Sequence, residues 1–99
     1  MAAQIIFHGI NRSPAVEAAV NEKVAALAKF DNQLVPCKVT VTQEGHQTMG
    51  AFTVSIDQPV AGRNLIVQRT NQDVMAAINE AFDTLRRGVI EEADKRRQH

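Results

Sequence analysis

The sequence of 99 residues predicts one α+β domain whose elements follow the order strand, helix, strand, strand, strand, helix. Two long segments repeat apolar residues every three or four positions, as amphipathic helices do. Four short segments are rich in β-branched and aromatic residues, and polar turn-forming segments separate them. Because a chain of this length forms one core, residues 1–99 are expected to be a single domain whose last few residues fray.

Adjacent signals predict the first strand and the first helix. Gln4–His8 is rich in Ile and Phe, and the turn-forming residues 9–12 end it. Ser13 can accept a hydrogen bond from an unpaired amide of the following turn, and Pro14 suits the first helical position because its missing N–H is not needed there. The helix is expected to run to residue 30. Its apolar positions are Val16, Val20, Val24, Leu27 and Phe30.

Three further strands are predicted from alternation with a period of two. Residues 37–42 alternate Cys and Val with Lys and Thr, and residues 52–57 alternate Phe, Val and Ile with polar residues. Residues 59–62 are interpreted as the turn that follows, and residues 64–69 as the fourth strand. Short turns favour antiparallel pairing of these three strands.

The sheet and the helices are expected to form two layers. The first strand reaches the second through a helix, which is the length of connection that parallel pairing requires. The sheet then has one polar face, and both helices cover the other. Two helices that lie side by side on one sheet face leave a groove between them.

The second helix carries the clearest pattern in the chain. Its cap is predicted to be either Thr70 or Asp73. Gly88 costs about 1 kcal/mol relative to alanine inside a helix, so either another segment approaches the backbone there or the helix weakens beyond it. The apolar face of this helix is predicted to consist of Val74, Ile78, Ala81, Leu85 and Val89.

Composition restricts the classes of function. Eleven basic and eleven acidic residues cancel, so any affinity for nucleic acid must come from where the charges lie. Cys37 is the only cysteine, which excludes an internal disulfide and suits a reducing compartment. No segment resembles a signal peptide or a membrane span, and we therefore expect a cytoplasmic protein without membrane contact.

Lys23 lies within the apolar arc of the first helix, close in projection to Val16 and Leu27. One interpretation lays its methylene groups on the edge of the core and carries the ammonium to water. The other points Lys23 into the groove between the helices. Lys29 is compatible with either a solvated surface or a binding role.

Arg86 and Arg87 occupy adjacent flanks of the second helix, and residues 95–97 add three more basic side chains. These residues could form a row of basic side chains that binds phosphates. The intervening acidic residues favour instead a salt-bridged helix end, with pairs such as Glu91 and Lys95. The sequence is compatible with both a phosphate-binding surface and a salt-bridged helix end.

The pattern contains little that predicts catalysis. His8, Cys37 and His46 lack the short paired spacings of zinc sites, and no carboxylate is placed beside them by a motif. No glycine-rich phosphate loop or dinucleotide fingerprint is present. We therefore expect no enzyme activity, no metal, no cofactor and no small-molecule substrate.

The chain resembles the bacterial ribosome hibernation promoting factor and ribosome-associated inhibitor family, in its short single-domain form. The resemblance spans nearly the whole sequence and is most specific in the second helix. The matching segments are residues 4–9, 13–17, 27–30, 72–78 and 81–87.

This resemblance implies a β-α-β-β-β-α fold like that of double-stranded RNA binding domains. It also implies binding to the small ribosomal subunit in the channel used by messenger and transfer RNA, which would inhibit translation and protect idle ribosomes under stress. Basic side chains on the helices of the family face rRNA. The candidate rRNA-binding residues here are Lys23, Lys29 and Arg87, with Arg86 and Lys95 nearby.

Several positions depart from the family pattern. Met75 replaces a usual tyrosine. Residues that are commonly polar or basic after the arginine pair are replaced by Gly88, Ile90, Glu91 and Glu92. The dimerising second domain of long members is not expected. A second hypothesis keeps the same fold as a protein-interaction or self-associating module without strong RNA binding, because the net charge is zero and acidic residues from Glu91 to Asp94 interrupt the basic ones.

Overall fold

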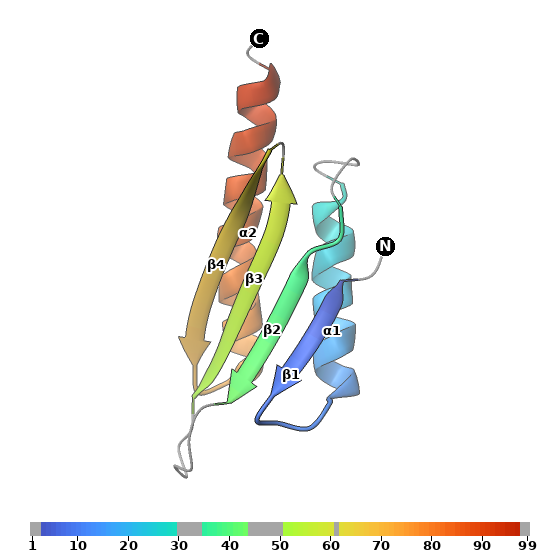
Figure 1. The fold of residues 1–99 in the computed structure, drawn as a ribbon, viewed down its shortest axis with the longest axis vertical. Coiled ribbons are helices and arrows are strands. Elements are labelled where there is room, and N and C mark those ends of the chain that lie inside the picture. Colours follow the sequence, from blue (N-terminus) through green and yellow to red (C-terminus); the bar gives the residue numbers. More distant parts are fainter. Residues whose placement is uncertain (1–2, 30–34, 44–50, 61, 98–99) are drawn as a thin grey trace.

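The computed structural model describes residues 3–29, 35–43, 51–60 and 62–97, with side chains described through Lys95. The elements follow the predicted order and form an elongated molecule (Figure 1). They are β1 (Gln4–His8), α1 (Pro14–Leu27), β2 (Lys38–Gln43), β3 (Phe52–Val60), β4 (Arg63–Asn71) and α2 (Val74–Arg97).

The four strands form one mixed sheet in the order β1-β2-β3-β4. β1 runs parallel to β2, and the other two pairs are antiparallel, as the connection lengths predict. Figure 1 shows both helices behind the sheet, so one sheet face is covered and the other is open. This confirms the predicted α+β class, the strand order and the placement of both helices on one face.

The core lies between the sheet and the helices. Val39, Ile56 and Val67 occupy one row across β2, β3 and β4, and all three are buried. Side chains at the neighbouring positions of each strand point to the open face, which accounts for the alternating sequence. The helices complete the core with Val16, Val20, Val24, Leu27, Ala77, Ile78, Ala81, Phe82, Leu85 and Val89.

The helix starts follow from capping side chains. The amide of Val16 donates to Ser13 Oγ at 3.3 Å, which satisfies one of the unpaired N–H groups of α1. Asp73 is the cap of α2, because its carboxylate accepts from the amide of Met75 at 3.0 Å. Thr70 belongs to β4 and is not the cap. The α1 helix ends at Leu27, and Phe30 lies outside the described residues.

The predicted turn at residues 59–62 is wrong in its first half, because Pro59 and Val60 belong to β3. Val60 pairs with Arg63, and in so short a hairpin this closing pair is hydrogen-bonded. Pro59 and Asn64 then form a non-hydrogen-bonded pair, so the missing N–H would point toward β2. The pairing of β2 with β3 ends at Asp57, so no residue of β2 is paired with Pro59 and no hydrogen bond to β2 is lost there.

Gly88 lies in the middle of α2, and the helix continues to Arg97. A methyl carbon added at Gly88 would lie 3.2 Å from Leu65 Cδ1, so β4 approaches the helix closely here. The first of the two alternatives predicted for Gly88 is therefore correct. Three polar contacts join the same two elements on either side of this point. They are Arg63 to Glu92 at 3.4 Å, Arg69 to Thr84 at 3.0 Å and Asn71 to Glu80 at 3.1 Å.

The length of α2, 24 residues, raises the question of membrane insertion. A bilayer-spanning helix needs about 20 predominantly apolar residues. Among the helices that the structure describes, none combines the length and the apolar character needed to cross a membrane.

Candidate nucleic-acid interface

A groove of about 310 Å³ lies between α1 and α2. Leu27 and Phe82 contribute to it although only 4% and 3% of their surfaces are exposed, so they form its apolar floor. The two helices lie on the same sheet face because each packs an apolar stripe on it, and this packing produces the groove. The groove is lined by Lys23, Ala26, Leu27, Lys29, Phe82, Asp83 and Arg86.

Lys23 is half-buried on α1 and lines the groove. The buried residues Val20, Val24 and Leu27 flank it on the same helix, which accounts for its position within the apolar arc. The two interpretations of Lys23 are therefore compatible, because a lysine can lay its methylene groups along apolar surface and still present its ammonium group to the groove. Its contact with RNA remains a prediction.

Lys29 and Arg86 approach the groove from different elements. Lys29 follows the last turn of α1, where its amide donates to the carbonyl of Ala26 at 3.3 Å. Arg86 lies on α2 one turn after Phe82 and faces α1. The fold thus brings together three basic residues, Lys23, Lys29 and Arg86, that are far apart in the sequence.

A second hollow, of about 400 Å³, lies next to the groove on α2 and contains Arg87. Its lining residues Asp83, Arg86, Arg87 and Ile90 are three or four positions apart and so share one helix face. Asp83 and Arg86 line both hollows. Arg87 therefore extends the basic surface of the groove over the outside of α2.

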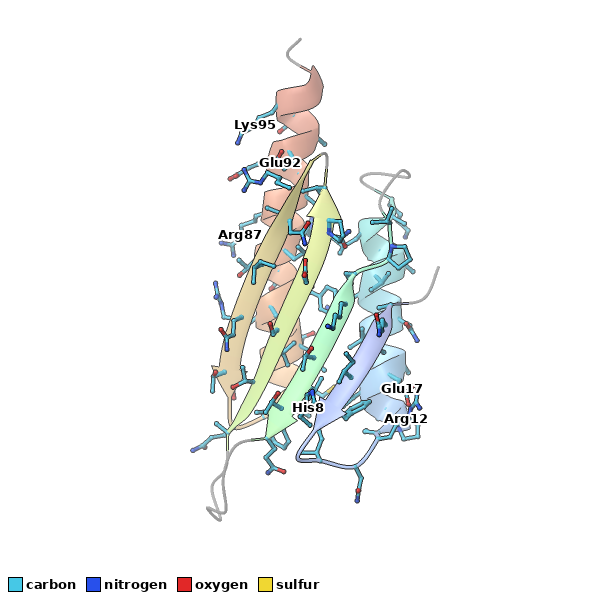
Figure 2. All side chains as sticks on the ribbon, viewed as in Figure 1. His8, Arg12, Glu17, Arg87, Glu92 and Lys95 are labelled. Atoms are coloured by element: carbon cyan, nitrogen blue, oxygen red, sulfur yellow. The ribbon has the colours of Figure 1, made fainter. Side chains whose placement is uncertain are left out.

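Lys95 does not belong to this surface. Its ammonium group lies 3.8 Å from Glu92, and the same carboxylate oxygen lies 3.4 Å from Arg63 on β4. Figure 2 shows Lys95 and Glu92 on the flank of α2 that faces away from α1. The predicted salt-bridged helix end is present, but the described partner of Lys95 is Glu92 rather than the predicted Glu91.

The basic residues differ in whether they form an ion pair with a carboxylate of the same chain. Arg12 donates two hydrogen bonds to Glu17, at 2.9 and 3.0 Å, which lower the pKa of the Glu17 carboxyl and raise the pKa of Arg12. By contrast, no carboxylate in the described part of the chain lies within 4.0 Å of the charged groups of Lys23, Lys29 or Arg87. These three cations are available to an external anion.

Asp83 is the one charged residue lining the groove that the sequence interpretation missed. It precedes Arg86 by three residues and Arg87 by four, and this spacing places all three on one face of a helix. The signal was therefore present in the sequence. With three cations and one carboxylate on its rim, the groove is arranged to bind an anion that also carries hydrogen-bond donors.

Two of the three residues considered for a metal or a nucleophile are described, and they lie apart: Cys37 precedes Lys38, which pairs with Gln4, whereas His8 pairs with Thr42 at the other end of β1. Cys37 is 1% exposed, and burial raises the pKa of its thiol to about 11, so it stays protonated near neutral pH. His8 is exposed at the end of β1, and His46 lies outside the described residues. Within the described ranges, no group of three His, Cys, Asp or Glu residues is placed to hold a metal ion.

Comparisons with known proteins agree on the fold. The N-terminal domain of Protein Y from Thermus thermophilus has a TM-score of 0.77 at 22% identity, over 92% of this chain and 98% of that one. A ribosomal subunit interface protein from Coxiella burnetii has a TM-score of 0.75 at 13% identity, over 100% of both chains. A search of curated proteins gave no match.

The family comparison covers more than the fold. A scan against protein-family models matches residues 3–97, which include every described strand and helix. The matched range includes both walls of the groove. This chain therefore belongs to the family described as Sigma 54 modulation protein / S30EA ribosomal protein.

Proposed function

We propose that this protein binds the small ribosomal subunit through its rRNA, in the channel used by messenger and transfer RNA, and inhibits translation by occupying that channel under stress. Membership of a family of ribosome-associated modulation factors confirms the family resemblance and supports the ribosome as the partner. The proposal includes a cytoplasmic location, where ribosomes are. It requires no catalysis, cofactor or small-molecule substrate.

The observation that carries the proposal is the gathering of Lys23, Lys29 and Arg86 around one groove. Lysine acts as a compact point charge toward a phosphate, whereas the guanidinium of arginine can donate two parallel hydrogen bonds. RNA backbones present phosphates at regular intervals, and proteins recognise RNA helices mainly through backbone and shape. A rigid groove with basic walls fits such a backbone.

The rigidity of the groove follows from its floor. Leu27 and Phe82 belong to the core, so the two walls cannot move apart without exposing apolar surface. Rigid walls keep the backbones of Lys23 and Arg86 at fixed positions, so only their side chains lose conformational freedom when they bind. Inhibition by occupancy needs such binding only, because a bound domain excludes other RNA from the same space.

The neutral net charge affects how the protein reaches its site. With eleven basic and eleven acidic residues, long-range attraction to RNA is weak, so affinity must come from the local cluster. The basic residues outside the groove, such as Arg12 and Arg63, are held by Glu17 and Glu92. Internal ion pairs thus engage Arg12 and Arg63, whereas Lys23, Lys29 and Arg87 have no such pair among the described residues.

Cosedimentation with purified small subunits tests this surface. Lys23→Glu and Arg87→Glu are expected to lose most of the binding at low salt, and the wild-type protein is expected to lose it at high salt. Lys38→Glu is the matched control, because Lys38 is exposed on β2 and its neighbour Val39 faces the core, which places Lys38 on the open sheet face. Equal binding by Lys23→Glu and Lys38→Glu would remove the groove from the proposal.

A competition experiment tests whether the protein binds in the channel used by messenger and transfer RNA. Small subunits loaded beforehand with messenger and transfer RNA are expected to bind much less protein than empty subunits. Undiminished binding to loaded subunits would place the protein elsewhere on the ribosome. The second hypothesis, a self-associating module, predicts no binding to either preparation together with a solution mass of two chains.

A further inference from the structure

β4 forms one lateral edge of the sheet, and its outer side is not paired by any described strand (Figure 1). It is nine residues long and pairs with β3 from Arg63 to Asn71 without a break. It contains no proline or glycine. The opposite edge strand, β1, offers only five residues. Long, regular edges of this kind are templates for pairing with another strand.

The pairing with β3 determines which backbone groups are free. Val60 and Arg63 close the hairpin as a hydrogen-bonded pair, so every second residue from Arg63 onward bonds to β3. The N–H and C=O groups of the intervening residues point outward. These residues are Asn64, Ile66, Gln68 and Thr70.

Side chains along β4 favour a second copy of the same strand. Ile66 is 63% exposed at the middle of the strand, whereas the arginines at positions 63 and 69 are bonded to α2. Val67 is the central residue, so two antiparallel copies related by a two-fold axis at Val67 overlap along all nine residues. In this register Arg63 faces Asn71 of the partner strand and Leu65 faces Arg69, so no like charges are opposed.

The side chain of Arg69 occupies one of the outward backbone groups of this edge. Arg69 Nη1 donates at 2.8 Å to the carbonyl oxygen of Gln68, which is one of the outward groups, and Nη2 donates at 3.0 Å to Thr84 on α2. Thr84 is held in turn by the carbonyl of Glu80 at 3.1 Å. In the two-fold register the Gln68 carbonyl would accept from Ile66 of the partner strand. Arg69 therefore competes directly with strand pairing.

We propose that the free edge of β4 is an interaction surface for β4 of a second copy of this chain, and that Arg69 keeps the edge closed in the monomer. Both arginines must leave their carbonyls when two copies pair. Removing the guanidinium should strengthen self-association by about 30-fold, since two exposed hydrogen bonds no longer oppose it. The inference concerns the sheet edge and is independent of RNA binding by the groove.

Sedimentation equilibrium across a wide concentration range tests the proposal. Arg69→Ala, and the milder Arg69→Gln, are expected to dimerise at lower concentration than the wild type. Arg63→Ala is the matched control, because Arg63 lies on the same strand and face but pairs with Glu92 instead of an edge carbonyl. The proposal is overturned if both Arg69 variants associate no more than Arg63→Ala does.

A second variant locates the interface. Gln68→Pro removes an outward N–H and leaves the bonds to β3 intact, so Arg69→Ala combined with Gln68→Pro should return to a monomer. A double variant that still dimerises would place the interface away from β4. Circular dichroism of each variant verifies that the fold is kept.

Cysteine cross-linking determines the register. A mixture of Ile66→Cys and Gln68→Cys chains in the Arg69→Ala background should form a disulfide between unlike chains, because the two positions face each other across the axis at Val67. Cys37 contributes little background, since it is 1% exposed. Cross-linking of Ile66→Cys chains alone, without the mixed product, would contradict this register.

Discussion

The contact between Gly88 and Leu65 gives the sharpest test of how α2 is fixed to the sheet. Substituting Gly88→Ala has two opposing effects on stability. Alanine favours the helix by about 1 kcal/mol relative to glycine. The added methyl carbon, however, would lie 3.2 Å from Leu65 Cδ1 and 3.8 Å from Leu65 Cδ2, and the first distance is shorter than an ordinary carbon contact.

The size of the second effect depends on how far Leu65 can move. Inserting a methyl group into a packed contact costs about 1 to 3 kcal/mol. Leu65 is half-buried on an edge strand, so we expect a cost of about 2 kcal/mol, near the middle of that range. Gly88→Ala should then destabilise the wild-type protein by about 1 kcal/mol. In a Leu65→Ala background the contact is absent, and Gly88→Ala should stabilise by about 1 kcal/mol.

Urea unfolding followed by circular dichroism measures all four corners of this double-mutant cycle. The coupling between the two positions is expected to be about 2 kcal/mol. If Gly88→Ala stabilises both backgrounds equally, the approach of Leu65 is not the reason for glycine at position 88. Equal destabilisation in both backgrounds would likewise refute the reasoning, because the cost would then lie within the helix.

Three further predictions concern the groove, the buried thiol and the helix cap. If the three groove cations and Arg87 meet phosphates, the logarithm of the binding constant should fall with the logarithm of salt concentration with a slope of about −3. Lys23→Gln should then make this slope less steep by about 0.8. An unchanged slope in salt titrations of this variant would mean that Lys23 meets no phosphate. Burial raises the pKa of the Cys37 thiol to about 11, so the unfolded chain loses its thiol proton at a lower pH than the folded chain does. The free energy of unfolding should therefore decline from about pH 9 to pH 11. A Cys37→Ala variant that loses as much stability over this range would contradict this cause. Asp73→Ala should lower the free energy of unfolding by about 1 kcal/mol because the helix cap is lost, whereas Thr70→Ala should lower it less. Equal losses for the two variants in urea unfolding would argue against Asp73 as the cap.

Much of the fold could be predicted because its signals are local. The Ser13-Pro14 start, the alternation in β2 and β3, and the apolar stripe of α2 each depend on neighbouring residues. The turn at residues 59–62 was misjudged because proline is usually read as a breaker. Its tolerance in β3 depends on where β2 stops pairing, which no local pattern contains.

The candidate site was predictable in part. Lys23 was identified by its odd place within an apolar arc, and Arg86 by its flank position. Lys95 was grouped with them because sequence spacing does not show which carboxylate a long side chain reaches. The structure separates Lys95 from the groove through its pair with Glu92, which also binds Arg63 from a distant strand.

The sequence by itself determined the element order, the start of α1 and the family, because these depend on periodicity and on short motifs. Tertiary structure alone decided which basic residues meet, since Lys23 and Arg86 are brought together only when α1 and α2 pack on the same sheet face. It also decided the reason for Gly88 and the role of Arg69 at the free edge. Those properties arise from contacts between segments far apart in the chain, and sequence spacing carries no information about such distances.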